Sequence, residues 1–209
     1  MMNHTSEGIR RPLSRRIFIT SLSLGLLTLP VAMRSGGRPA GRAIDVEHSS
    51  LKIHVSKSGF FSAFAHNHEI EAPIVSGEVQ ITSTPSVELR FDTRKMRVLD
   101  PEASESTRAQ IQKTMEGPQV LDADRFPEIH FLSTEVEAKG TDHWVVRGTL
   151  DLHGQSHPVT ADVTLKDGRY LGTTTLKQTG FGITPVTVGG GTVKVKDELK
   201  IEFSIALAQ

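Results

Sequence analysis

The sequence predicts an all-β fold of antiparallel strands, on three observations. Apolar or small side chains alternate with polar ones at 144–152 and again at 159–165, on either side of a tight turn. The same period of two recurs along most of the chain between short turn segments, and only one stretch has helical character. The final segment, 199–207, alternates most clearly of all, and we expect it to pair with the first strand and close the sheet.

Residues 1–43 are predicted to be an export signal and linker, and residues 44–209 a single β domain. Arg15 and Arg16 stand directly before an apolar run, a pattern that closely resembles a twin-arginine export signal. The run is interrupted by small and polar residues, and at about 17 residues it is shorter than the roughly 20 that a membrane span needs. We therefore expect a cleaved signal, with cleavage after Ala43 or after Gly37, and a periplasmic or otherwise extracytoplasmic location. An uncleaved N-terminal anchor is the alternative.

The period of two assigns the strands in chain order. They are expected at 51–55, 75–81, 87–91, 126–133, 144–152, 159–165, 170–178 and 199–207. Two adjacent pairs, 75–81 with 87–91 and 144–152 with 159–165, are predicted to be antiparallel hairpins. The segment 60–70, if extended, places two phenylalanines and two histidines on one face. Residues 179–196 are Gly-rich and are predicted to be a loop with a turn or bulge, because they lack the context of a phosphate-binding loop.

One short helix is predicted between Asp100 and Gly117. Asp100 can cap the helix, Pro101 suits its first position, and 103–115 is rich in helix formers, after which Gly117 and Pro118 end it. We expect this helix to lie over an open end of the sheet, where an insertion between strands would act as a lid. The residues expected to follow it as a plug are Val120, Leu121 and Phe126.

Composition excludes several classes of protein. The chain has 209 residues, with 24 basic and 24 acidic side chains, so no net charge favours nucleic acid or an anionic membrane as a partner. It has no cysteine, which excludes a disulfide scaffold, a thiolate zinc site, a cysteine nucleophile and N-terminal Cys acylation.

Two motifs at matching spacing carry a family resemblance. Residues 126–133 (FPEIHFLS) look like the F/Y-P-x-I-x-F-x-S motif of the YceI-like family, and 148–159 (GTLDLHGQSHPV) look like its G-x-L-T-L-H-G-x-T-x-P-V hairpin. The resemblance implies an eight-stranded antiparallel β-barrel, lipocalin-like, with the predicted helix as a short insertion. It also implies a typically periplasmic protein, and some members hold a long polyisoprenoid chain inside. Lys57 stands where the family usually has a His, and 75–77 lack its Phe-x-Gly; these departures bear on the ligand more than on the fold.

The interior of an eight-stranded barrel is wide enough to be filled by side chains or to hold one apolar ligand. Small residues at inward positions favour a cavity: Gly77, Gly148, Ala161 and Gly172. The alternative is that the inward residues pack on each other as a solid core, as in a surface-interaction domain. The resemblance favours the cavity. The expected ligand-binding residues are Phe60, Phe64, His66, His68, Phe91, Leu121, Phe126, Phe131, Trp144, Phe181 and Phe203.

The histidines admit two interpretations. We expect His66 and His68 to lie near the barrel rim and to donate hydrogen bonds to a ligand's polar head, such as a phosphate or quinone oxygen. A metal site is disfavoured, because only two ligands are local and His153 and His157 occupy a turn. No serine in a strand-to-helix elbow and no pair of carboxylates in an evident cleft points to catalysis.

The sequence therefore predicts an exported binding protein, monomeric or weakly dimeric, without catalysis. Its expected ligand is a lipid or isoprenoid-like small molecule, with no cofactor, no metal and no nucleic acid, and with room for transient contact with a membrane surface. The alternative function is a metal- or haem-associated periplasmic redox or stress accessory that uses His66 and His68.

Overall fold

The structure is a computed structural model and describes residues 41–58, 67–188, 190 and 193–209. The chain divides into two units, Met1–Gly36 and Gly37–Gln209, and the fold below is that of the second. The predicted twin-arginine signal lies outside the described residues, as do Phe60, Phe64 and His66. Predictions that concern those residues stay predictions.

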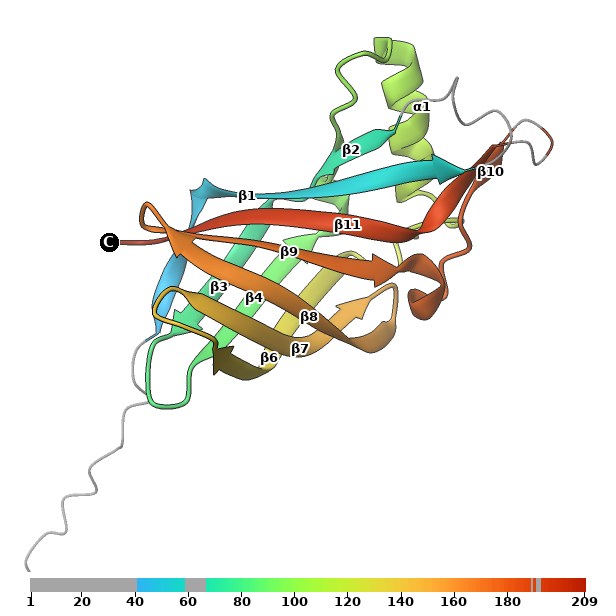
Figure 1. The fold of residues 1–209 in the computed structure, drawn as a ribbon. Coiled ribbons are helices and arrows are strands. Elements are labelled where there is room, and N and C mark those ends of the chain that lie inside the picture. The colour runs from blue at the N-terminus through green and yellow to red at the C-terminus, as the bar shows by residue number, and fades with distance from the viewer. Residues whose placement is uncertain (1–40, 59–66, 189, 191–192) are drawn as a thin grey trace, which may run out of the picture. The chain divides into compact units, whose positions relative to one another are not determined.

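Eleven strands and one α-helix make up the described domain (Figure 1). The strands are β1 (Arg42–Ser58), β2 (His68–Glu71), β3 (Ile74–Gln80), β4 (Ser86–Asp92), β5 (Arg97–Val98), β6 (Glu128–Ala138), β7 (His143–Leu152), β8 (Gln155–Lys166), β9 (Arg169–Lys177), β10 (Thr187–Val188) and β11 (Val193–Leu207). The helix is α1 (Glu105–Glu116), and two short 3₁₀ helices lie at Thr93–Lys95 and Gln178–Phe181.

Eight of the strands close into an antiparallel barrel, as the family resemblance implies. The strand order in the barrel is β1-β3-β4-β6-β7-β8-β9-β11. Each strand pairs with the next one in this order, and β11 pairs with β1, which closes the barrel. Ile53 lies opposite Ile201 in that closing ladder, so the last strand meets the first as predicted. Closure leaves the barrel without a free edge along these strands.

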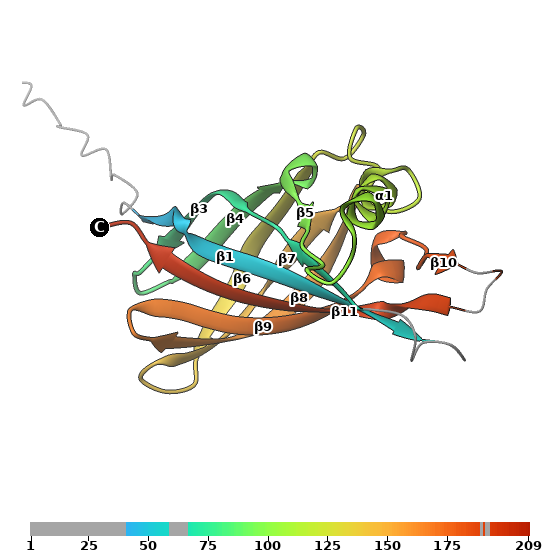
Figure 2. The same cartoon turned by 90° about the horizontal axis from the view of Figure 1, so that it is seen from above.

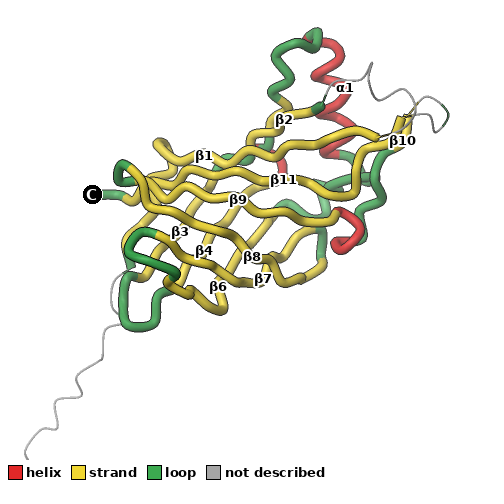
Figure 3. The backbone as a smooth tube through the Cα atoms, viewed as in Figure 1, coloured by secondary structure: helices red, strands yellow, loops and turns green. Residues whose placement is uncertain are grey.

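The remaining short strands extend one end of the barrel. β2 pairs with the C-terminal half of β1, β5 pairs with β2, and β10 pairs with the start of β11. The helix α1 lies at this same end, whereas the C-terminus lies at the opposite one (Figures 1 and 2). We call the first of these the helix end and the other the hairpin end, because the β3–β4, β6–β7 and β8–β9 turns lie there (Figure 3).

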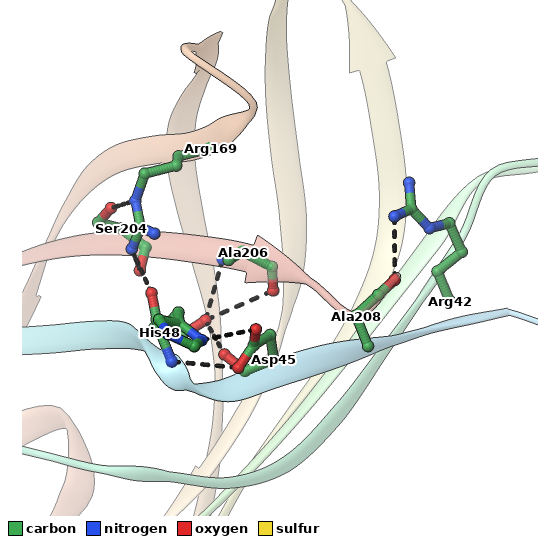
Figure 4. A network of polar contacts seen from close by, with 8 residues as sticks. Arg42, Asp45, His48, Arg169, Ser204, Ala206 and Ala208 are labelled. Carbon is green, nitrogen blue, oxygen red and sulfur yellow. Dashed lines mark hydrogen bonds and ion pairs between the residues drawn. The ribbon is translucent and has the colours of Figure 1, made fainter.

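A bulge in β1 lets this long strand pair with two different strands on the same side. Before the bulge Arg42 and Ala43 pair with β3, and after it 52–55 pair with β2. Side chains fix its shape (Figure 4): Ser49 Oγ donates to the Asp45 carbonyl at 2.6 Å and accepts from the Ala206 N–H at 2.9 Å. The bulge therefore bends β1 while keeping the backbone groups around it hydrogen-bonded.

Arg169 and Arg42 tie the same region to β11 (Figure 4). Arg169 donates to the Ser204 hydroxyl at 2.7 Å and to the His48 carbonyl in the bulge. Arg42 Nη2 donates to the Ala208 carbonyl at 3.0 Å, at the C-terminal end of the barrel wall. Both arginines stabilise the junction at which the barrel closes.

Three local expectations are wrong. The helix begins at Glu105 with Ser104 as its N-cap, whose side chain accepts from the Thr107 N–H at 3.2 Å, so Asp100 is not the cap and Ala103 precedes the helix. A bulge in β3 leaves Val75 42% exposed and buries Ile74 in its place. The predicted Gly-rich loop at 179–196 contains β10 and the first residues of β11.

The predicted alternation otherwise sorts the wall into two faces. On β8 the inward residues Val159, Ala161 and Val163 line the interior, and Thr160 and Asp162 between them are exposed. Apolar side chains from all the barrel strands thus face the same interior.

Candidate ligand-binding interior

The barrel contains two cavities, one toward each end. The helix-side cavity has a volume of about 500 Å³ and is lined by Ile70, Met115 and Leu121 among others. The hairpin-side cavity has a volume of about 220 Å³ and reaches Ile81 and Pro85 at the β3–β4 hairpin, where Ile81 is 61% exposed. The described side chains therefore do not fill the barrel, which disfavours the alternative of a solid core.

The two cavities adjoin at a ring of apolar side chains that line both of them, which we call the waist. Its members come from five strands of the barrel: Leu51, Phe91, Leu150, Leu176 and Ile201. None of these side chains can form a hydrogen bond, so an apolar chain crossing the waist would leave no polar group unsatisfied. The two cavities thus share a boundary that is wholly apolar.

Glycines in the wall hold two aromatic rings of the hairpin-side cavity. A Cβ added at Gly172 would lie 2.3 Å from Cζ of Phe203, its cross-strand neighbour, and one added at Gly148 would lie 2.4 Å from Cε2 of Phe131. The sequence predicts that these glycines create open space. In the structure the Phe203 and Phe131 rings occupy that space and therefore lie close to the wall. Because rings against the wall do not project across the barrel, the glycines widen the lumen indirectly.

The helix-side cavity carries a polar cluster in its wall. Among the described residues that line the interior, the acidic and basic side chains are Lys57, His68 and Asp100, and all three belong to this cavity. His68 lies opposite Val55 in the β1–β2 ladder, and Lys57 follows two residues later on the same face of β1. The acidic and basic side chains of the described lining are thus confined to the helix end.

Asp100 orients the histidine of this cluster. Its side chain is only 5% exposed, and it accepts hydrogen bonds from His68 Nδ1 and, at 2.8 Å, from the Glu69 backbone N–H. Because the carboxylate holds Nδ1–H, the second ring nitrogen, Nε2, faces away from this bond and can serve a ligand. His68 is 16% exposed, so little bulk water competes for that nitrogen.

Lys57 brings a cation to the same wall. Burial lowers the pKa of the Lys57 ammonium below its ordinary value, and the negative charge of Asp100 acts in the opposite direction. Its Nζ forms no ion pair with a residue in the described part of the chain, whereas the outward Lys52 on the same strand bonds Glu69 at 2.7 Å. Lys57 is therefore available to an anionic or hydrogen-bond-accepting group in the cavity.

The helix borders the mouth of this cavity and is fastened to β5 by one side chain. Gln112 accepts from the Val98 N–H at 2.9 Å and donates to the Met96 carbonyl at 2.8 Å, so its amide pairs with the strand backbone. Thr107, Gln110 and Thr114 line the cavity yet are exposed, which places them at its opening. α1 thus lies over an open end of the barrel, as predicted.

The structure brings most of the described candidate residues to the interior. His68, Phe91 and Leu121 line the helix-side cavity, and Phe91, Phe131, Trp144 and Phe203 line the hairpin-side cavity. Sequence reasoning missed Lys57 and Asp100. The inward alternation of 51, 53 and 55 could have identified Lys57, but no local signal shows that Asp100 pairs with a histidine 32 residues earlier.

Two predicted site residues, Phe126 and Phe181, line neither cavity. The Phe126 ring packs edge-on against His153 with 4.7 Å between ring centroids, and Phe181 is 2% exposed and packs against His157. The Phe181 carbonyl also accepts from His153 Nδ1 at 3.1 Å. Both phenylalanines support the β7–β8 turn, and their positions do not support a role in ligand contact or, for Phe126, as a plug.

The histidines do not assemble into a metal centre in the described chain. His153 and His157 are occupied by the contacts just described, and His68 by Asp100. No group of three or more His, Asp or Glu side chains in the described ranges could hold a metal ion. His66, on which the metal hypothesis also depends, lies outside those ranges.

Comparison with known proteins assigns the chain to a family. A family profile described as "YceI-like domain" matches residues 43–207. The chain belongs to the YceI-like family. Curated relatives include a UPF0312 protein of Shewanella denitrificans, 26% identical over 200 residues, which cover 90% of this chain and 97% of that protein. A UPF0312 protein of Vibrio cholerae is 25% identical over 195 residues, which cover 88% of this chain and 96% of the relative.

A solved structure confirms the fold. The structure of Burkholderia cenocepacia BcnA aligns with a TM-score of 0.61 and 18% identity, and the alignment covers 79% of this chain and 99% of BcnA. The YceI-like family is a family of binding proteins, and its members are generally periplasmic. Within the described residues, no helix has the length and apolar character that crossing a membrane requires.

Proposed function

We propose that this YceI-like protein is an exported binding protein that holds a lipid-like or polyisoprenoid-like molecule inside its barrel and catalyses no reaction. The observation that supports the proposal is the pair of adjoining cavities, about 500 and 220 Å³, with an apolar waist between them. Cavities of this size lined by aliphatic and aromatic side chains are typical of small-molecule sites.

The apolar wall supplies the binding free energy. Burying one methylene group contributes about 0.8 kcal/mol, so a long hydrocarbon chain binds through the hydrophobic effect without any polar contact. The acidic and basic side chains of the described lining are restricted to one end, which favours an amphiphile with one polar end.

Filling the hairpin-side cavity tests the proposal. Ala161 lies inward on β8, and its replacement by phenylalanine (A161F) places a ring in the space that a ligand tail would occupy. We expect native mass spectrometry of gently extracted wild-type protein to show a co-purifying lipid, and A161F to carry at most about a tenth as much.

The matched control is Thr160→Phe, one residue earlier on the exposed face of the same strand. It adds the same ring outside the barrel, so its lipid content should equal that of the wild type, with both variants melting cooperatively. Wild-type protein that carries no lipid and takes up none from vesicles, or an A161F variant as loaded as the wild type, would overturn the proposal.

A further inference from the structure

The polar cluster of the helix-side cavity limits the chemistry of the ligand's head. Lys57, His68 and Asp100 all line this cavity, whereas the hairpin-side cavity has no acidic or basic side chain among its described lining residues. An amphiphile therefore gains its best contacts with its head at the helix end and its tail through the waist. The orientation follows from the placement of charge alone.

The cluster is built to donate hydrogen bonds rather than to accept them. Both oxygens of Asp100 are already engaged as acceptors, by His68 Nδ1 and by the Glu69 N–H. The Lys57 ammonium carries donors and no acceptor. A head group with acceptor oxygens complements it.

The charge of the cluster points to a head with a single negative charge. Asp100 and His68 pair with each other, whereas Lys57 forms no ion pair with a residue in the described part of the chain. One anionic head gives Lys57 its counter-ion, whereas a head with two or more negative charges leaves uncompensated charge in a poorly solvated site. A neutral hydroxyl head leaves the Lys57 cation without a counter-ion.

We propose that the helix-side cavity binds the carboxylate of a long-chain monocarboxylic acid, with Lys57 Nζ as its donor. The tail then crosses the waist into the hairpin-side cavity. The hydrogen bond between His68 and Asp100 keeps the Asp100 carboxylate paired and so leaves Lys57 to the ligand. This proposal rests on the proposed function, because it names the head group of a molecule held in the same interior.

Three ligands with the same tail test the head group. The affinities of palmitic acid, 1-hexadecanol and hexadecyl phosphate for the full-length mature protein can be compared by calorimetry or by displacement of a fluorescent lipid. We expect palmitic acid to bind at least about tenfold more tightly than the alcohol, as one charge-assisted hydrogen bond allows, and more tightly than the phosphate.

Variants of two lysines on one strand then locate the effect. Lys57→Met should reduce palmitic acid affinity about tenfold and leave 1-hexadecanol affinity within about twofold of wild type, since only the charged contact is lost. Lys57→Arg should retain palmitic acid binding. Lys52→Met is the matched control, because Lys52 faces outward on β1 and pairs with Glu69.

The outcomes separate this inference from the proposed function. Equal affinity for the acid and the alcohol, tighter binding of the phosphate, or an equal loss for every ligand in Lys57→Met would overturn the head-group assignment while leaving a lipid-binding barrel. Absence of binding for all three ligands, together with no co-purifying lipid, would overturn the proposed function as well. Should Lys57→Met unfold, the comparison of ligands on wild type and Lys57→Arg still decides the question.

Discussion

At the scale of single residues, the shape of the interior depends on where side chains are absent. Gly172 faces Phe203 across the β9–β11 ladder, and the ring occupies the place of a Cβ. A larger residue at this position would press on the ring and on the Asp162 carbonyl, which lies 2.5 Å from the added atom. A glycine is thus required for packing, although its backbone is ordinary extended strand.

Gly172→Ala is therefore expected to destabilise the fold by about 1–3 kcal/mol, the usual effect of overpacking, and to push the Phe203 ring into the lumen. Urea denaturation measures the free energy of unfolding. Thr173→Ala, one residue later on the exposed face of β9, should change it by less than about 0.5 kcal/mol. Equal stability of the two variants would show that the wall adapts to the extra methyl group.

At the scale of elements, α1 is held less firmly than the barrel strands. It buries only Met115 fully, and its side-chain hydrogen bonds to the strand backbone come from Gln112. An element with few buried contacts opens with a lower free energy than the core. α1 is thus the part of the described wall best suited to open for a ligand.

Gln112→Ala should release this helix. The change removes the acceptor of the Val98 N–H, at about 1–3 kcal/mol for such a group when buried. The Met96 carbonyl keeps the hydrogen bond that Arg97 Nη1 donates at 2.7 Å. We expect hydrogen exchange of the α1 amides to accelerate while the β7 and β8 amides stay protected, and palmitic acid to dissociate faster. Lys113→Ala, at an exposed position of α1 outside the described cavity lining, is the control. If it matches Gln112→Ala, the hydrogen bonds of Gln112 have no special role.

At the scale of the whole molecule, closure of the barrel depends on the first residues of the domain. The register between β1 and β3 places Arg42 opposite Val79 and Ala43 opposite Glu78. The Ala208 N–H also donates to the Ala43 carbonyl at 2.9 Å. Signal cleavage after Ala43 would remove these residues from the barrel, so cleavage upstream, such as after Gly37, leaves the ladder complete.

We therefore expect the exported protein to retain Arg42 and Ala43, which N-terminal sequencing of the extracytoplasmic fraction measures. A chain starting at Ile44 should melt several degrees below one starting at Arg38, because a loss of 1 kcal/mol lowers Tm by roughly 2–4 °C in a domain of this size. A mature N-terminus at Ile44 with unchanged Tm would contradict the prediction.

Sequence alone determined the strands and which face of each is apolar. The period of two is local, and in an antiparallel wall it fixes which side chains turn inward, so Phe91, Phe131, Trp144 and Phe203 were predictable. Family motifs added the barrel and its strand number, which periodicity cannot supply. Where a bulge shifts the alternation, as at Val75, the local rule fails.

Only the tertiary structure decided how the inward side chains share the space. The pairing of Asp100 with His68 joins segments 32 residues apart, and the position of Phe126 beside His153 depends on how the turns of the helix end pack. Both are contacts between distant parts of the chain, and neither leaves a local pattern. The same reason explains why the interior is divided into two cavities, and why its acidic and basic side chains line the one that α1 borders.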